Sequence, residues 1–297
     1  MRIDRLDEHV IHGTIGFPVG IYDMRFDNAC DILFPVHYHR EFELFIVTAG
    51  SIRLQLEGEE FCLDEGRGIF INSGSLHSTY AMSRECGFLA IVFSPEFIVS
   101  EHEELYEKYI RPVIKKSAVF SFLLGKEAVS LAYEANEHFR SESCGYELFI
   151  KSDLIRIMAL IAGTVRYAGN ESKDHRIDTV KSVLDFIHEN YNDNITLADM
   201  AEHAHISKEY LCRIFRELSD LPPVTYLNRY RIMRSAELLR DSVRSISEIA
   251  LECGFNGSSY FNKLFLRFMK CTPKQYRRHC GGQRGADAEQ YGEYCAF

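Results

Sequence analysis

The sequence predicts an α+β protein of two domains: a β-barrel with an attached helical segment, then an all-α domain with two helix-turn-helix units. Three observations predict this fold class. Residues 16–93 form short alternating runs, a helical period replaces them after Pro95, and residues 179–278 show the pattern of short helices. With 297 residues, the chain is long enough for two hydrophobic cores.

The composition is that of a globular protein, with 46% hydrophobic and 26% charged residues. Apolar runs fall short of the roughly 20 residues of a membrane span, and the start MRIDRLDEHV is charged where a secretory signal is apolar. We therefore expect a cytoplasmic protein.

The net charge is −9, but residues 178–280 carry 15 basic and 13 acidic residues. This asymmetry predicts different functions for the two parts, with any phosphate contact made by local placement of charge.

Short strands are expected between residues 16 and 93. The runs are rich in β-branched and aromatic residues, and glycines or charged turns separate them at about ten-residue spacing. They are IYDMRF, FELFIVTAG, SIRLQLEG, EEFCLDEG, GIFIN and FLAIVF. This pattern predicts a small barrel or sandwich.

Two helices are expected after the strands. Residues 123–140 give one apolar face with Leu124, Ala128, Leu131, Ala135 and Phe139. Residues 146–167 give another with Leu148, Leu154, Ile155, Met158, Ile161, Ala162 and Val165. Such a pair covers the barrel or pairs with another subunit, and we expect it to mediate homodimerisation. The first domain thus spans residues 1–168, followed by a polar linker at 169–178.

Seven helices are expected in the second domain, residues 179–280. They lie near 179–190, 196–204, 207–218, 223–241, 246–253, 257–269 and 273–279. The tail, residues 281–297, lacks periodicity and is expected to be mobile.

A first helix-turn-helix unit is expected in ITLADMAEHAHISKEYLCRIFREL, residues 195–218. Thr196 and Ser207 are placed to cap its two helices. The second helix turns Leu211, Ile214, Phe215 and Leu218 inward and leaves Lys208, Glu209, Cys212, Arg213 and Arg216 outward. The second helix of such a unit enters the major groove of DNA.

The same layout returns in SISEIALECGFNGSSYFNKLFLRFMK, residues 245–270, where Ser245 caps and Gly254 allows the turn a positive φ. Its second helix has an apolar side of Tyr260, Phe261, Leu264, Phe265 and Phe268, and an outward side of Ser258, Ser259, Asn262, Lys263 and Arg267. A spacer of about 18 residues, roughly 27 Å as a helix, separates the units. Two recognition helices at this separation could enter successive major grooves. The alternative is a helical bundle that binds no nucleic acid.

Residues 179–279 resemble the DNA-binding domain of the AraC/XylS family of bacterial transcription regulators. The resemblance is carried by SKEYLCRIFRE, YLNRYRIMRSAELL and SISEIALECGFNGSSYFNKLFLRFMKCTPKQYRR. Leu221 and Pro222 depart from a family pattern in which glycine often precedes the spacer, so we expect a local change in that turn. The resemblance implies base-reading residues at Glu209, Cys212, Arg213, Ser258, Ser259, Asn262 and Lys263, which is nearly the outward set.

Arginine can pair with guanine edges and asparagine with adenine, as Arg213 and Asn262 would do. Lys208, Arg216 and Arg267 could equally hold phosphates, which position the protein without specifying sequence. The spacer also carries Arg229, Arg231, Arg234 and Arg240, which are solvated, ion-paired or in contact with phosphate.

The stretch HYHREFE, residues 37–43, sets two histidines and a glutamate on one face if the strand runs unbroken. With Gly50, and with His77 following Gly66 and Gly74, this set resembles the two motifs of the cupin fold, with Asn72 in place of a proline. The N-terminal barrel is therefore expected to be cupin-like. In metal-binding cupins the matching residues are the ligands, so the resemblance implies a divalent metal (Zn, Mn, Fe or Ni) on His37, His39, Glu43 and His77.

Three interpretations of this set stay open: an effector pocket without chemistry, a bound metal in a sensor, or a metal-dependent cupin enzyme. Fusion to two helix-turn-helix units favours the sensor over the enzyme. Pocket-lining residues would be His37, His39, Glu43, Phe45, Arg53 and His77, with Tyr38 and Tyr80 at the rim. Rings and polar groups together suit sugars or other polyols.

The sequence therefore predicts a transcription regulator without catalytic residues. Its partners would be a double-stranded DNA operator, a small-molecule effector, RNA polymerase and a second copy of the chain. Activation is the commoner role in the family that it resembles.

Overall fold

The structure is a computed structural model that describes residues 12–14, 16–27, 29, 32–115, 118–119, 123–164, 166–167 and 174–281. The chain divides into two compact units between Lys173 and Asp174. Part of the expected linker, residues 169–173, and the tail beyond Gly281 lie outside the described residues.

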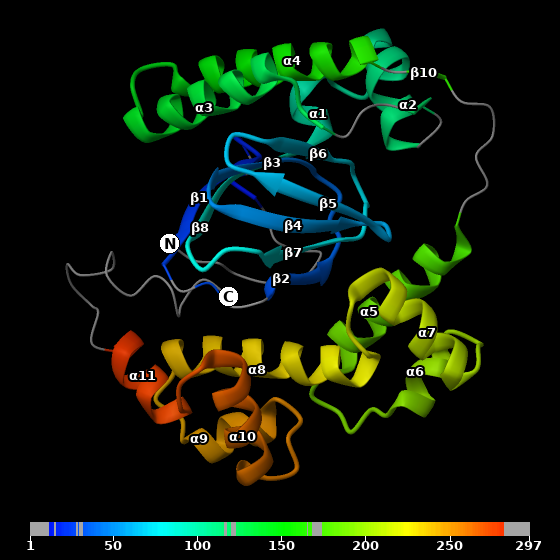
Figure 1. The fold of residues 1–297 in the computed structure, drawn as a ribbon, viewed down its shortest axis with the longest axis vertical. Helices are drawn as coiled ribbons and strands as arrows, with labels where there is room; N and C mark the ends of the chain where they lie inside the picture. The colour runs from blue at the N-terminus through cyan, green and yellow to red at the C-terminus, as the bar shows by residue number, and fades with distance from the viewer. Residues whose placement is uncertain are drawn as a thin grey trace. The chain divides into compact units, whose positions relative to one another are not determined.

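The first unit contains two four-stranded antiparallel sheets (Figure 1). Sheet A has the order β1-β8-β3-β6 and sheet B the order β2-β7-β4-β5. The strands are β1 (Val19–Phe26), β2 (Ile32–His37), β3 (Phe42–Ala49), β4 (Ser51–Leu56), β5 (Glu59–Asp64), β6 (Gly68–Ile71), β7 (His77–Ala81) and β8 (Cys86–Phe93). The predicted barrel of short strands is confirmed, and its two inner faces enclose the region around Glu43.

Sheet A is covered on its outer face by helices, as Figure 1 shows for α3 (Lys126–Ser141) and α4 (Tyr146–Thr164). One face of β3, with Phe42, Leu44 and Ile46, is fully buried in a core that it shares with both helices. The opposite face of β3 therefore points between the sheets, because neighbouring strand residues alternate in direction. Glu43 and Phe45 lie on that inner face.

The inner face predicted for α4 is wrong at Leu148 and Ile155, which are 74% and 42% exposed. Packing selects a neighbouring face instead, with Ile150, Leu154, Ile157, Met158 and Ile161 buried. Apolar residues surround most of this helix, so its periodicity alone cannot identify the face that meets the core. Val165 lies outside the described residues.

Short elements join these parts: α1 (Pro95–Ile98), the π-helical turn η1 (Tyr106–Ile110), α2 (Arg111–Ile114), and β9 (Ala118–Val119) paired with β10 (Arg166–Tyr167). Asn72 connects α2 to the barrel, since its Nδ2 donates to the carbonyl of Val113 at 2.7 Å.

The second unit has seven helices in its described part: α5 (His175–Asn190), α6 (Leu197–His203), α7 (Lys208–Ser219), α8 (Pro223–Asp241), α9 (Ile246–Glu252), α10 (Ser258–Met269) and α11 (Pro273–Gly281). The first begins four residues before the expected start, inside the expected linker. The early start of this helix is explained by Asp174, whose side chain caps the helix by accepting from the Arg176 backbone N–H at 2.9 Å.

The predicted helix starts at Thr196, Ser207 and Ser245 are confirmed as caps, and Thr196 and Ser245 form full capping boxes with acids three residues later. Tyr260 was expected on the apolar side of α10 but is 53% exposed. Its hydroxyl accepts from Asn228 Nδ2 at 3.3 Å, so the ring lies at the edge of the core.

Among the described residues, none of the helices is both long and apolar enough to cross a membrane.

Candidate functional site

The stretch HYHREFE does not form the unbroken strand that would set His37, His39 and Glu43 on one face. Strand β2 ends at His37 in sheet B, and β3 begins at Phe42 in sheet A. The intervening residues carry the chain from one sheet to the other, which places His39 between them. His37 pairs directly with His77 of β7, so both rings lie on the same sheet. The predicted set is thus brought together, but by two sheets facing each other and not by one strand.

Glu43 is the centre of the cluster. Its Oε2 lies 3.2 Å from His39 Nε2 and 3.3 Å from His77 Nε2. The His37 and His77 ring centroids are 4.1 Å apart. His39, Glu43 and His77 are buried, with exposures of 8%, 7% and 3%.

Backbone carbonyls orient two of the rings. His37 Nδ1 contacts the carbonyl of Pro35 at 2.9 Å, and His77 Nδ1 contacts that of Ser75 at 2.9 Å. Because a carbonyl only accepts, each Nδ1 carries the proton, and Nε2 is the nitrogen left to face the cluster. The Nε2–carboxylate contact of His77 is then favourable only with a proton or a cation between the two atoms.

The turn before β7 is tied to the same cluster. The Gly74 backbone N–H donates to the carbonyl of His39 at 2.7 Å, and Ser73 N–H donates to Asn72 Oδ1 at 2.8 Å. Gly74 has a φ of 68°, in the region that glycine adopts without strain. One compact turn therefore positions His39 and His77 together.

Charge in the cluster is unevenly shared. Burial alone lowers the pKa of His39, but hydrogen bonds and charge from Glu41 and Glu43 outweigh it and raise the pKa to about 9. Burial raises the pKa of Glu43, yet its hydrogen bonds with His39 and His77 leave that pKa well below its usual range. Burial, with the neighbouring histidines, lowers the pKa of His37, so this ring is neutral. The cluster thus combines one buried anion, one cation and one neutral ring.

His12 and Tyr22 also lie beside the cluster, although neither was among the predicted site residues. His12 Nδ1 hydrogen-bonds with the Tyr22 hydroxyl at 2.8 Å, and its ring lies 5.7 Å from that of His39. Burial and the positive His39 lower the pKa of His12 to about 4. His12 lies 25 residues before His37, outside both motifs, so the spacing gave no signal for it.

Of the residues expected at the pocket, Phe45 lies beside the histidines, whereas Arg53 and Tyr80 lie away from them. Phe45 faces inward and stacks on Phe88 at 4.9 Å, so it packs in an aromatic group beside the histidines. Arg53 does not line this pocket, because it pairs with Tyr80, which lies on the opposite face of β7 from His77. Its guanidinium lies 4.0 Å from the Tyr80 ring and bonds with Glu60 at 2.7 Å. Tyr80 is likewise buried outside the pocket, while Tyr38 is half-buried in the segment between β2 and β3.

The three histidines have the chemistry of a metal site. One ligand nitrogen from each of His37, His39 and His77 lies within 4.8 Å of the others. The Nδ1–carbonyl contacts are the outer contacts that ligating histidines usually make. The carboxylate of Glu43, which contacts His39 and His77, would be available as a further ligand.

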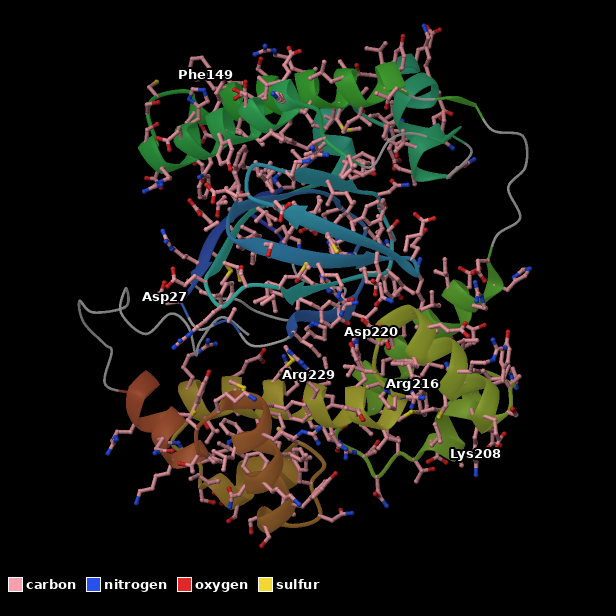
Figure 2. The ribbon with its side chains drawn as sticks, viewed as in Figure 1. Asp27, Phe149, Lys208, Arg216, Asp220 and Arg229 are labelled. Atoms are coloured by element: carbon pink, nitrogen blue, oxygen red, sulfur yellow. The ribbon has the colours of Figure 1, made fainter. Side chains whose placement is uncertain are left out.

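The outward face of α7 is polar and accessible. Lys208, Glu209, Arg213 and Arg216 are exposed and Cys212 is half-buried, while Leu211, Ile214 and Phe215 are buried (Figure 2 labels Lys208 and Arg216). Arg213 is held by Glu217 at 3.1 Å and lies 4.9 Å from the Tyr210 ring. It is therefore preset on this face and can exchange its carboxylate partner for another acceptor.

The outward face of α10 matches that of α7. Ser258, Ser259, Asn262, Lys263 and Arg267 are all exposed, and Phe261 and Phe265 are buried against α8, α9 and α11. The two helices thus present all ten predicted DNA-contacting side chains at the surface or half-exposed.

The spacer arginines have different surroundings. Arg234 forms an ion pair with Glu237 at 2.7 Å. Arg231 is only 7% exposed and donates to the backbone carbonyls of Tyr191 and Asp193 at 2.7 and 2.6 Å. Neither solvation nor an ion pair, two of the expected alternatives, describes Arg231. Arg229 and Arg240 are half-exposed.

Comparison with known proteins gives matches to both units. Residues 25–116 match a family model described as an AraC-like ligand binding domain, and residues 200–279 match one described as a helix-turn-helix domain. The uncharacterized HTH-type transcriptional regulator YdeC of Bacillus subtilis (strain 168) is 28% identical over 281 residues, covering 92% of this chain and 96% of its own.

Two further relatives carry more specific names. The HTH-type transcriptional activator RhaR of Mannheimia succiniciproducens is 24% identical over 248 residues, covering 82% of this chain and 87% of its own. The melibiose operon regulatory protein of Escherichia coli (strain K12) is 35% identical over 119 residues, covering 40% and 39%.

The raised pKa of His39 predicts a pH-dependent stability of the chelator-treated protein. A histidine whose pKa is higher in the folded state stabilises fully below its unfolded value near 6.5, and this stabilisation is lost as pH rises to about 9. We expect the free energy of unfolding to fall in that window with a slope of up to about 1.4 kcal/mol per pH unit. His39→Gln should lack this slope. Urea unfolding of both proteins at several pH values measures it, and parallel profiles would contradict the prediction.

Proposed function

Because the chain belongs to the AraC family of DNA-binding transcription regulators, we propose that it is a one-component regulator that couples a small effector to operator binding. The observation that carries this is the pair of recognition helices, α7 and α10, with apolar faces buried and polar faces exposed. An effector that binds one arrangement of the molecule better than another shifts the population and so the affinity for DNA. The relatives are regulators and not enzymes, and we propose that this chain has no catalytic residues.

The effector we propose is a sugar or another small polyol, bound beside the histidine cluster. Two observations support it: the inner face of the barrel combines rings with carboxylate and imidazole groups, and one relative is named for the melibiose operon. A DNA footprint that is identical with and without each candidate sugar would count against this class. We further propose that the protein acts in the cytoplasm and activates transcription through RNA polymerase. A relative named as an activator supports activation over repression.

A second candidate function is metal sensing by the same cluster. The observation that favours it is the convergence of three imidazoles, two of which contact the buried carboxylate of Glu43. His37, His39, His77 and Glu43 would hold a divalent ion of the Zn, Mn, Fe or Ni type. Such an ion supplies a positive centre to which effector oxygens can bind. The protein's own contribution is to orient the rings through the carbonyls of Pro35 and Ser75.

We also propose a homodimer that uses the exposed side of α4. Leu148, Ser152, Ile155, Ala159 and Ala162 follow one another at alternating intervals of four and three residues, the spacing of a two-helix seam. The first four are exposed in the single chain, and Phe149, labelled in Figure 2, extends the apolar surface at 53% exposure. A second copy of the helix would bury this surface.

Replacing the cations of the recognition helices should weaken DNA binding. We expect Arg213→Ala and Lys263→Ala each to cost roughly 1–3 kcal/mol of binding free energy for DNA selected by the wild-type protein. The domain should stay folded, since both side chains are exposed. A gel-shift titration measures this, with Lys274→Ala, an exposed lysine of α11, as the charge-matched control. Wild-type affinity in both variants would remove these residues from the interface.

Metal content tests the second candidate. Full-length protein purified without a His-tag should carry about one divalent ion per chain by elemental analysis, since four ligands define one site. His37→Gln and His77→Gln should each lose it, while the exposed His102→Gln retains it. Protein that is isolated metal-free and also fails to take up added Zn, Mn, Fe or Ni would contradict metal sensing.

The oligomeric state tests the α4 surface. We expect wild-type protein to sediment as a dimer and the double variant Leu148→Glu, Ile155→Glu as a monomer, because buried charges without partners oppose association. Leu251→Glu, at a 65% exposed position of α9, is the matched control and should remain dimeric. A wild-type monomer at micromolar concentration, or a dimeric double variant, would exclude this interface.

A further inference from the structure

Arg231 of the spacer helix α8 joins parts of the two helix-turn-helix units. Its Nε donates to the Tyr191 carbonyl at 2.7 Å and a terminal nitrogen donates to the Asp193 carbonyl at 2.6 Å, both in the segment that leads into α6. The same guanidinium lies 5.8 Å from the ring of Phe255, in the turn between α9 and α10. One buried cation thus contacts the entrance to the first unit and the turn of the second.

The turn of the second helix-turn-helix unit also lies directly against the segment that joins α5 to α6. A Cβ on Gly254 would lie 2.6 Å from the Tyr191 carbonyl oxygen and 2.9 Å from Arg231 Nε, distances that no side chain tolerates unless the neighbours move. Glycine is therefore needed here for close approach as well as for its φ of 78°.

The first unit provides an internal comparison. His205 occupies the equivalent place in the turn between α6 and α7, and it adopts a similar φ of 54° with an exposed side chain. A side chain is accommodated at that position of the turn when nothing packs against it. The requirement for glycine at position 254 comes from the contact between the units.

We infer that Arg231 and Gly254 form a joint that holds the two recognition helices in one relative orientation and thereby sets the spacing of the two DNA segments that the protein reads. Arg231 is a positioning residue and touches no DNA. A second bridge supports the same arrangement, since Asn228 of α8 donates to the Tyr260 hydroxyl of α10 at 3.3 Å. This inference rests on the proposed DNA binding by both units.

A rigid pair of recognition helices responds to a change in the spacing of its two DNA segments differently from a flexible pair. One inserted base pair moves the second segment by about 3.4 Å and rotates it by about 35°. A fixed pair of helices must then deform the DNA or give up one set of contacts. A loosened pair can follow the displaced segment, so its affinity depends less on spacing.

The experiment uses the full-length protein and DNA that the wild type selects from a randomised pool. Affinity is measured for the selected site, for versions with one base pair added or removed between the two segments, and for each segment alone. We expect wild type to lose about ten-fold or more on the altered spacings. Arg231→Gln should lose less than about three-fold, and should bind each single segment about as well as wild type.

Two further variants guard against a folding defect. Arg231→Lys keeps the buried cation but lacks the fork that reaches two carbonyls, so it should show an intermediate spacing penalty. Arg240→Gln removes a cation from the end of the same helix, away from the joint, and should keep the wild-type penalty. Circular dichroism verifies that each variant is folded. If Arg231→Gln is unfolded, the spacing penalty of Arg231→Lys provides the test instead.

The outcomes distinguish a failure of the joint from a failure of DNA binding. A wild-type penalty that persists in the folded Arg231 variants overturns the joint, as does selection of a single DNA segment by wild type. If the wild type selects no common sequence, sequence-specific DNA binding is overturned, and the joint with it. A smaller penalty in Arg231→Gln, with intact single-segment binding, supports the joint because a general loss of stability would weaken both measurements.

Discussion

The first unit is organised around one buried carboxylate. Glu43 belongs to sheet A, and its oxygen contacts the ring of His77 from sheet B and the ring of His39 from the connection between the sheets. A charge at this depth is tolerated only when partners replace the water that it lost, so the two sheets must meet in one register. The carbonyl contacts of His37 and His77, and the turn at Gly74, keep the partners in place. The same arrangement that satisfies the charge also brings the three histidines together.

The helical domain is organised by a different constraint, because its proposed DNA binding depends on side chains that stay outside the hydrophobic core. Buried Phe, Leu and Ile residues fix one side of α7 and of α10, and the polar residues are left on the other. The capping boxes at Thr196 and Ser245 fix where the first helix of each unit begins. Both α7 and α10 contact α8, so this helix relates the position of one recognition helix to that of the other.

Much of this could be predicted from local sequence. The seven helices, their caps, and the short strands follow from patterns that span a few residues, and packing did not override them. Errors arose where the answer depends on distant partners. Arg53 faces away from His77 because strand pairing sets its direction, and Leu148 is exposed because an apolar helix offers several possible inner faces. His12 gave no signal, and the burial of Arg231 was not among the alternatives for it, since neither a ring contact nor a carbonyl acceptor far along the chain leaves a spacing pattern.

Asn72 stands where the matching cupin motif has a proline, and the difference adds a connection. Its side-chain amide donates to the Val113 carbonyl of α2, whereas proline has no N–H of any kind to offer. The turn that begins at Asn72 also holds the backbone of His39. A displacement of this turn must therefore either break this bond or be transmitted to α2, which makes one amide group a mechanical link between the histidine cluster and that helix.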